Sequence, residues 1–372
     1  MDVLSEFENR VMKSNGLVCY GAGKRLQLFG LYFMQSPIMN KLIYCVDRNV
    51  SLQKTQVDVQ GKKINVYPRE RLYHDRDKNI VLLITNVRYD EVIEELKAQD
   101  NLHGIEYYCF SHILGFLAEK QALDKTVPVP AVSTLNMQIP KIIHYCWFGR
   151  NEIPNKYKKW MESWKKYCPD YEIIMWNEDN YDVTKNAYMY EAFQCKKWGF
   201  VPDYARLDII YQYGGIYLDT DVELVQNIDD ILFQKAFCGF ETNYLVNFGL
   251  GFGAIKGLPI IKKLRDDYDN RHFINEDGKM NLISSPYIQT NYLSDCGLKQ
   301  NGEYQMIEDL TIYPEKMFSA KNVYSRRVRL KEYTKSIHHY EATWLDENSR
   351  RFNETFEREM NENGKAVFHG KI

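Results

Sequence analysis

Short apolar runs alternate with amphipathic stretches through residues 1–120. The spacing of polar and apolar positions between the runs is helical, most clearly at 89–99. The runs have the length and the Val, Ile, Leu and Tyr content of buried strands, and they lie at 17–20, 42–47, 80–85 and 105–110. Alternation of strand and helix favours parallel pairing, so this region is predicted to form a small, doubly wound, Rossmann-like parallel-sheet domain.

A proline-containing interruption at 121–137 separates this region from the rest of the chain. Pro128, Pro130 and small residues break both periodicities there, which is typical of a linker. Beyond it the alternation resumes, with a strand predicted at 139–147, a helix at 155–167, a strand at 171–176 and a helix at 202–213. We therefore predict a second α/β domain over residues 138–372.

A glycine loop follows the first predicted strand. Gly21-Ala22-Gly23, with Asp47 at the end of the next strand, partly matches a dinucleotide-binding fingerprint. The third glycine of that fingerprint is replaced by Leu26, whose side chain would crowd the close packing of helix on strand. We favour glycines that only make a tight turn; an NAD-dependent sugar-modifying enzyme is the alternative.

Composition and charge bound the function classes. With 48 basic and 50 acidic side chains the formal charge is -2, so no global field attracts nucleic acid or an anionic membrane. The eight cysteines form no CxxC pair and no metal-ligand spacing. No run approaches the ~18 apolar residues of a membrane span, and the charged N-terminal segment lacks an apolar signal core. We expect a cytoplasmic protein, with peripheral contact at the inner face of the membrane left open.

The segment 201–224 concentrates the candidate chemistry. Asp203 and Arg206 are three residues apart on a predicted helix, so both can project from one face. Gly214-Gly215 then allows a sharp turn, and a short strand leads into Asp219-Thr220-Asp221. In an extended chain residues two apart point to the same side, so we expect both carboxylates to face one site.

Two carboxylates that face one site repel each other unless a cation lies between them. Mg²⁺ and Mn²⁺ prefer hard oxygen ligands and keep positions open for phosphate oxygens. Such a cation would neutralise a departing nucleoside diphosphate by Lewis-acid catalysis. A bare Asp-x-Asp is usually a solvated strand end, but the preceding helix and Gly-Gly turn favour the functional interpretation here.

Four motifs occur in order over residues 138–346: IPKIIHYCWFG (139–149), SWKKYCPDYEIIMWNED (163–179), PDYARLDIIYQYGGIYLDTDVEL (202–224) and IHHYEATW (337–344). Together they resemble glycosyltransferase family 32, the DXD-containing sugar transferases of the capsular polysaccharide synthesis type. The catalytic domains of large clostridial glucosylating toxins are more distantly similar. The resemblance implies a GT-A fold, an α/β domain with a central mixed sheet, together with a divalent metal and retention of anomeric configuration.

The resemblance also implies roles for the central residues. Asp219 and Asp221 look like the metal and diphosphate pair, with Asp219 also on the donor. Asp203 and Arg206 resemble the Asp and Arg that hold hydroxyls of the donor sugar. We assign these four residues as catalytic. Pro202 stands where many members carry Ser, a departure that leaves Asp203 and Arg206 intact.

The flanking motifs supply the remaining candidates. Trp147 resembles the aromatic residue that packs on the nucleotide base, a role that we favour over the alternative of a plain core residue. His338, as a third metal ligand, and Trp344, as a diphosphate ligand, are carried over from the C-terminal motif, with Thr343 a further candidate. Imidazole suits transition metals, and an indole N–H can donate to a phosphate oxygen. His339 would point the other way if the segment is extended.

A second set of residues stays outside the assigned site. His144 lies on the same predicted strand as Trp147 and could be a buried, hydrogen-bonded residue. Asn243 and Asn247 lie where family members line the acceptor side of the cleft, and Ser285 begins a loose match to a Gly-Pro turn of the family.

These observations predict a retaining hexosyltransferase that moves a hexose or N-acetylhexosamine from a nucleotide-diphosphate sugar to a glycan or lipid-linked glycan in surface polysaccharide biosynthesis. A UDP-sugar is favoured over GDP-mannose, and the metal is Mn²⁺ or Mg²⁺. Whether the acceptor attacks on the same face or an enzyme carboxylate forms an adduct stays open. The rival outside the enzymes is a glycan-binding protein on a degenerate transferase fold.

Overall fold

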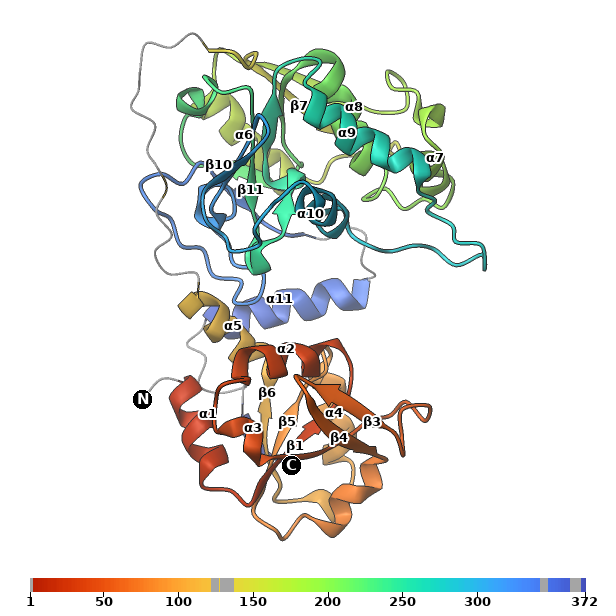
Figure 1. The fold of residues 1–372 in the computed structure, drawn as a ribbon, viewed down its shortest axis with the longest axis vertical. Coiled ribbons are helices and arrows are strands. Elements are labelled where there is room, and N and C mark those ends of the chain that lie inside the picture. Colours follow the sequence, from red (N-terminus) through yellow and green to blue (C-terminus); the bar gives the residue numbers. More distant parts are fainter. Residues whose placement is uncertain (1–2, 122–126, 128–136, 342–346, 362–368) are drawn as a thin grey trace. The chain divides into compact units, whose positions relative to one another are not determined.

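The computed structural model describes residues 3–121, 127, 137–341, 347–361 and 369–372 (Figure 1). Its contacts divide the chain into two compact units. The first comprises Met1–Gln121, Tyr324–Arg327 and Arg351–Ile372, and the second Ala122–Val323 and Val328–Arg350. Most of the predicted linker, together with Thr343 and Trp344, lies outside the described residues.

One predicted boundary differs. The sequence predicts a single domain over all of 138–372, whereas Arg351–Ile372 belongs to the first unit. The reason is a strand at the end of the chain: β17 (His369–Lys371) pairs antiparallel with β6 (Glu106–Cys109), at what would otherwise be an open sheet edge.

The first unit contains a seven-stranded sheet in the order β17-β6-β5-β1-β2-β4-β3. Its central strands run parallel, as the sequence predicts, and only the edge strands β3 and β17 are antiparallel to their neighbours. The remaining strand bounds are β1 (Gly16–Tyr20), β2 (Leu42–Val46), β3 (Gln56–Val59), β4 (Lys62–Tyr67) and β5 (Ile80–Ile84).

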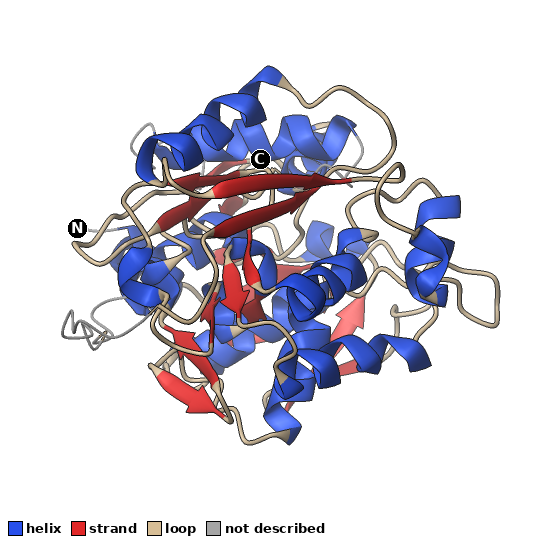
Figure 2. Cartoon of the chain, turned by 90° about the horizontal axis from the view of Figure 1, so that it is seen from above, coloured by secondary structure: helices blue, strands red, loops and turns tan. Residues whose placement is uncertain are grey.

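Helices cover both faces of this sheet (Figure 2). Side chains alternate between the two faces along each strand, so β1 contributes Leu17 and Cys19 to one core and Val18 and Tyr20 to the other. The first core is completed by α1 (Val3–Met12), α2 (Lys24–Phe33), α3 (Ile38–Lys41) and α5 (Phe110–Gln121). The second is completed by α4 (Tyr89–Lys97) and α11 (Glu347–Asn361), beside the short helices η1 (Arg69–His74) and η2 (Asp100–Leu102).

The glycine loop after β1 makes a tight turn. Gly21 has φ +111°, a conformation that favours glycine. Asp47 accepts hydrogen bonds from the backbone N–H of Ala22 (2.7 Å) and of Asn49 (2.8 Å). Leu26, where the fingerprint has its third glycine, is fully buried in the core. The loop is thus closed by contacts of the chain itself; the dinucleotide alternative stays a hypothesis.

The second unit contains a mixed sheet in the order β14-β15-β11-β13-β9-β7-β8, with β12 paired to β11. Strands β8, β7, β9, β11 and β15 share one direction, and β13 and β14 run against it. The bounds are β7 (Ile142–Cys146), β8 (Glu172–Trp176), β9 (Gly215–Tyr217), β11 (Ala236–Phe240), β12 (Val246–Asn247), β13 (Phe252–Ala254), β14 (Gln305–Ile307) and β15 (Leu310–Tyr313).

Helices and short 3-10 turns connect and cover these strands. The predicted helices at 155–167 and 202–213 are confirmed with the same bounds, as α6 (Asn155–Tyr167) and α8 (Pro202–Tyr213). The others are η3 (Val183–Lys185), α7 (Ala187–Gln194), η4 (Asp229–Ile231), η5 (Thr242–Tyr244), η6 (Phe248–Leu250), α9 (Pro259–Asp266), η7 (Asp267–Asn270), α10 (Ser285–Asp295) and η8 (Glu315–Met317). Helices α7 to α10 pack on one face of the sheet, and α6 and η8 contribute to the core on the other.

A separate two-stranded antiparallel sheet joins β10 (Val222–Leu224) to β16 (Ser336–His338). It brings together segments more than 100 residues apart in the chain. None of the helices in the described ranges combines the length and apolar character that crossing a bilayer requires.

Candidate functional site

Three parallel strands of the second unit deliver the candidate residues to one edge of the sheet. Trp147 directly follows β7, Asp219 follows β9 after one intervening residue, and Glu241 directly follows β11. The carboxyl ends of strands that run in one direction meet at the same edge, which is where open α/β sheets bind ligands. The sheet topology therefore gathers these residues at a single edge.

The Asp-Thr-Asp segment is a turn rather than extended chain. The strand ends at Tyr217, and the backbone N–H of Val222 donates to the carbonyl of Asp219 (3.0 Å). The two carboxylates were expected to share a side because the chain is extended, and the chain is not extended here. The turn still brings Asp219 and Asp221 to the same place, together with His338, and one ligand atom from each lies within 4.8 Å of the others.

His338 reaches this site through the pairing of β10 with β16. Val222 lies opposite His338 in that register, and the backbone N–H of His339 donates to the carbonyl of Asp221 (2.9 Å). The Nε2 of His338 is 3.1 Å from Asp221 Oδ1. His339 instead pairs with Glu223 (2.9 Å) and stacks on Trp160 with ring centroids 3.9 Å apart, so it does not join the cluster.

Electrostatics within the cluster favours charged groups. Burial acts to raise the pKa of Asp221, but the positive charge and hydrogen bond of His338 outweigh it and lower that pKa to about 2. Burial acts to lower the pKa of His338, and Asp221 raises it above its ordinary value in the same way. Asp221 and His338 thus each favour the charged form of the other.

Asp203 and Arg206 project from one face of α8, as their spacing predicts, and there they form a buried ion pair beside the turn. Arg206 Nη2 lies 3.1 Å from Asp203 Oδ1 and 3.6 Å from Asp219 Oδ1, and its Nε donates to the carbonyl of Pro202 (3.1 Å). The guanidinium lies over the ring of Tyr217, 5.2 Å from the centroid. Burial raises the pKa of Asp203 to about 6, although Arg206 acts against that rise.

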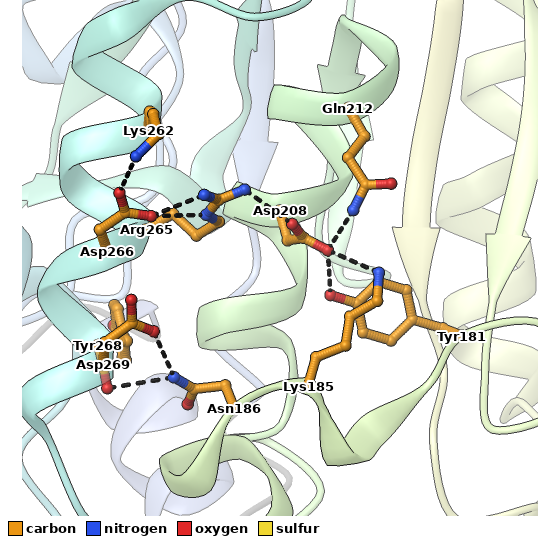
Figure 3. Close-up of polar contacts among 10 residues, drawn as sticks. All are labelled: Tyr181, Lys185, Asn186, Asp208, Gln212, Lys262, Arg265, Asp266, Tyr268 and Asp269. Atoms are coloured by element: carbon orange, nitrogen blue, oxygen red, sulfur yellow. Dashed lines mark hydrogen bonds and ion pairs between the residues drawn. The ribbon is translucent and has the colours of Figure 1, made fainter.

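A second polar network holds α8 in place from another side (Figure 3). Buried Asp208 accepts hydrogen bonds from Tyr181 (2.7 Å), Lys185 (3.1 Å), Gln212 (2.6 Å) and Arg265 (3.1 Å). These partners belong to the η3 segment, α8 itself and α9. Because every donor meets one carboxylate, the network fixes the helix that carries Asp203 and Arg206.

His144 supports the Gly-Gly turn and not the chemistry. It is fully buried, its Nδ1 accepts from the indole N–H of Trp176 (3.0 Å), and its Nε2 therefore donates to the carbonyl of Gly214 (2.9 Å). Burial lowers its pKa to about 4, so it stays neutral. The structural interpretation left open by the sequence holds for this residue.

Of the two tryptophans predicted to bind the nucleotide, the structure describes Trp147 but not Trp344. Trp147 is partly exposed at the sheet edge; its indole N–H donates to the carbonyl of Asn151 (2.6 Å) and its ring meets Tyr157 edge-on. A role for Trp147 in packing on a base stays a prediction. Trp344 and Thr343 lie outside the described residues.

The structure adds residues that the sequence analysis left out or left unassigned. The hydroxyl of Tyr217 donates to Asp219 Oδ1 (3.0 Å). Gly249 lies so close to Asp219 that a side-chain Cβ there would overlap Oδ2 of the carboxylate. Ser285 hydrogen-bonds to Asp203 and lowers its pKa. Tyr217 could have been suspected from its place beside the acidic turn, whereas the other two contacts are tertiary.

The donor set suits a divalent cation. Two carboxylates and one imidazole offer two hard oxygens and a nitrogen, a combination that transition ions such as Mn²⁺ accept more readily than Mg²⁺. The Nδ1 of His338 is buried and has no recorded partner among the described residues. Asp219, Asp221 and His338 are the residues that would hold the ion.

Comparison with known proteins agrees with this geometry. Residues 154–238 match the family model described as the glycosyltransferase sugar-binding region containing DXD motif. This stretch of the second unit is therefore similar to the sugar-binding region of DXD-containing glycosyltransferases. The predicted fold class is confirmed: a parallel α/β unit, and a mixed α/β sheet of the GT-A type with the acidic turn at its carboxyl edge.

Individual relatives are similar over part of the chain. Inositol phosphoceramide mannosyltransferase 3 of Schizosaccharomyces pombe is 33% identical over 151 residues, 38% of this chain and 41% of that protein. Mannosyl phosphorylinositol ceramide synthase SUR1 of Saccharomyces cerevisiae is 31% identical over 27% of each chain. The chain thus spans less than half the length of these relatives. A solved structure, the PaToxG glycosyltransferase, is 22% identical, with a TM-score of 0.34, over 50% of this chain and 79% of that one.

Proposed function

We propose that this protein is a metal-dependent, retaining glycosyltransferase that moves a hexose or N-acetylhexosamine from a nucleotide-diphosphate sugar to a glycan or lipid-linked glycan. The observation that carries the proposal is the convergence of Asp219, Asp221 and His338 at one sheet edge, within 4.8 Å of one another, beside the buried Asp203–Arg206 pair. The two carboxylates and the imidazole suit a divalent cation, and such a cation would neutralise the diphosphate of a nucleotide-sugar donor.

The residues divide the work between the two ends of the donor. When bound, a divalent ion supplies Lewis-acid stabilisation of the departing diphosphate. Asp219, Asp221 and His338 hold it, and Tyr217 and Arg206 orient the carboxylate of Asp219 through contacts of 3.0 Å and 3.6 Å. Asp203, buried and paired with Arg206, is placed to accept a hydroxyl of the transferred sugar.

The names of the relatives change which nucleotide-sugar donor we favour. From sequence a UDP-sugar was favoured over GDP-mannose. The relatives with the names given above are mannosyltransferases, which supports mannose as the transferred sugar. We therefore put GDP-mannose first in any screen, with UDP-hexoses and UDP-N-acetylhexosamines beside it.

The relatives also bear on the acceptor and the setting. The names of the relatives refer to inositol phosphoceramides, which supports an acceptor with a lipid part. We propose a lipid-linked intermediate of surface polysaccharide biosynthesis, of the capsular type, handled by a cytoplasmic enzyme at the inner face of the membrane. A glycan primer without lipid is the comparison that tests this point.

The test is a screen for donor hydrolysis. The purified chain is incubated with GDP-mannose and the common UDP-sugars in the presence of Mn²⁺, Mg²⁺ or a chelator, and the release of nucleoside diphosphate is measured. Metal-dependent release from at least one donor is expected. Absence of release from every donor, with NAD raising the thermal stability and nucleoside diphosphates having no effect, would refute the proposal in favour of the dinucleotide alternative.

A further inference from the structure

Glu241 lies at the same sheet edge as the metal cluster but belongs to a different strand. It directly follows β11, whereas Asp219 follows β9, and β13 lies between these two parallel strands. Neighbouring strands are about 4.8 Å apart, so two strand spacings set these positions about 10 Å apart along the edge. The side chains bridge part of this separation, because a Cβ at Gly249 would meet both Asp219 Oδ2 and Asn247 Oδ1.

The backbone around Glu241 forms a tight loop that presents its side chain. The N–H of Glu241 donates to the carbonyl of Leu245 (2.7 Å), and the N–H of Tyr244 donates back to the carbonyl of Glu241 (3.0 Å). Asn243 and Tyr244 within the loop both have left-handed φ, 69° and 58°. Consecutive left-handed residues other than glycine cost free energy and collect at functional sites.

One carboxylate oxygen of Glu241 is held and the other is not. Oε2 accepts a hydrogen bond from the side-chain amide of Asn247 (2.8 Å), whose own carbonyl accepts from the N–H of Gly249 (2.7 Å). No hydrogen bond to Oε1 is recorded among the described residues, and Oε1 is not among the buried atoms that lack a partner. Oε1 is therefore open to a ligand.

The surroundings of Glu241, as far as the structure describes them, offer this carboxylate no direct ion pair. Among the described residues no Lys or Arg forms an ion pair with Glu241, and the nearby Glu315 is already paired with Lys316 (3.1 Å) and hydrogen-bonded by Thr242 (3.1 Å). Burial raises the pKa of Glu241 to about 7, and the charge of His338 acts against that rise.

We propose that Glu241 binds a sugar hydroxyl, with Oε1 as the acceptor and Asn247 as the group that fixes its orientation. This inference rests on the proposed transferase function and adds a substrate contact that neither the motifs nor the relatives assign. The hydroxyl belongs either to the transferred sugar or to the acceptor glycan, which share this chemistry. In both cases the carboxylate acts on a sugar and not on the diphosphate.

The variant Glu241→Gln tests the proposal, because glutamine keeps the size of the side chain and an oxygen for Asn247 while removing the charge. Hydrogen bonds to a charged acceptor are strong, so we expect a loss of about 10- to 100-fold in kcat/KM. If the sugar is the transferred one, donor hydrolysis without acceptor is impaired; if it is the acceptor, only transfer is impaired, through the acceptor KM. The affinity for nucleoside diphosphate with Mn²⁺, measured by calorimetry, is expected to be unchanged.

The control is Glu315→Gln, which removes a neighbouring carboxylate that is already paired within the protein. It is expected to lower thermal stability and to leave both KM values unchanged. The proposal is overturned if Glu241→Gln retains wild-type kinetics, if its kinetics match those of Glu315→Gln, or if it loses nucleoside-diphosphate affinity, since that would place its effect on Asp219. If the wild-type chain hydrolyses no donor, the proposed function fails first and the inference with it.

Discussion

Replacement of the buried Asp203 by asparagine is expected to stabilise the protein while it abolishes activity. Burial raises the pKa of this carboxyl from 3.8 to about 6, so its ionised form is disfavoured in the folded state despite Arg206, 3.1 Å away. The difference between these values, at about 1.4 kcal/mol per pH unit, corresponds to about 3 kcal/mol. Asparagine avoids this cost, so the variant is expected to be more stable at pH 7 by up to that amount.

The dependence on pH has a definite sign. Because the pKa is higher in the folded state, the folded protein keeps a proton that the unfolded chain has lost. The free energy of unfolding of the wild type therefore falls as the pH rises from about 4 to about 6 and changes no further above that through this group. Asp203→Asn has no such carboxyl group, so its free energy of unfolding does not fall in this way. The difference in stability between the variant and the wild type therefore grows from about pH 4 to about pH 6.

Urea unfolding followed by tryptophan fluorescence measures this effect in the right part of the molecule, because all six tryptophans (147, 160, 164, 176, 198 and 344) belong to the second unit. The control is Asp179→Asn, which removes an exposed carboxylate paired with Arg150 (2.6 Å) and is expected to change little. A variant less stable than wild type at pH 7 would refute the reasoning, since the ion pair with Arg206 would then outweigh the cost of burial. Donor hydrolysis is expected to fall about 100-fold or more in either case, because a buried contact to the sugar is lost.

Further predictions concern the same edge of the sheet. Asp221→Asn is expected to keep the fold but to lose the rise in Tm that Mn²⁺ gives the wild type, with activity lower by about 100-fold or more; unchanged metal-dependent turnover would contradict the metal assignment. Arg206→Ala is expected to reduce transfer by about 100-fold with nucleoside-diphosphate affinity largely kept, and calorimetry that shows both lost together would contradict a role on the sugar. Gly249→Ala places a Cβ against Asp219 Oδ2, so a metal titration is expected to show affinity lower by about 10-fold or more, and a wild-type titration would speak against that contact.

Local pattern determined much of this protein. The alternation of apolar runs with helical periodicity predicted two α/β regions. This works because the apolar stripe of a helix and the buried face of a strand are both set by residues close together in the sequence. The three-residue spacing of Asp203 and Arg206 predicted that both lie on one face of α8, because a helix brings those positions together whatever surrounds it. Their ion pair was found only in the structure.

The tertiary structure decided what depends on long-range register. The Asp-Thr-Asp segment is a turn, and the partner that balances Asp221 is His338, brought by the pairing of Val222 with a residue 116 positions later. The resemblance pointed to Asn243 and Asn247 near Glu241 but not to Glu241 itself, whose place beside the site follows from β13 lying between β9 and β11. The last strand, β17, belongs to the first unit because it pairs with β6, whose edge would otherwise be open. The residues of β17 alone do not indicate this partner. Local periodicity reports which face of an element is buried; it holds no information on which distant element covers that face.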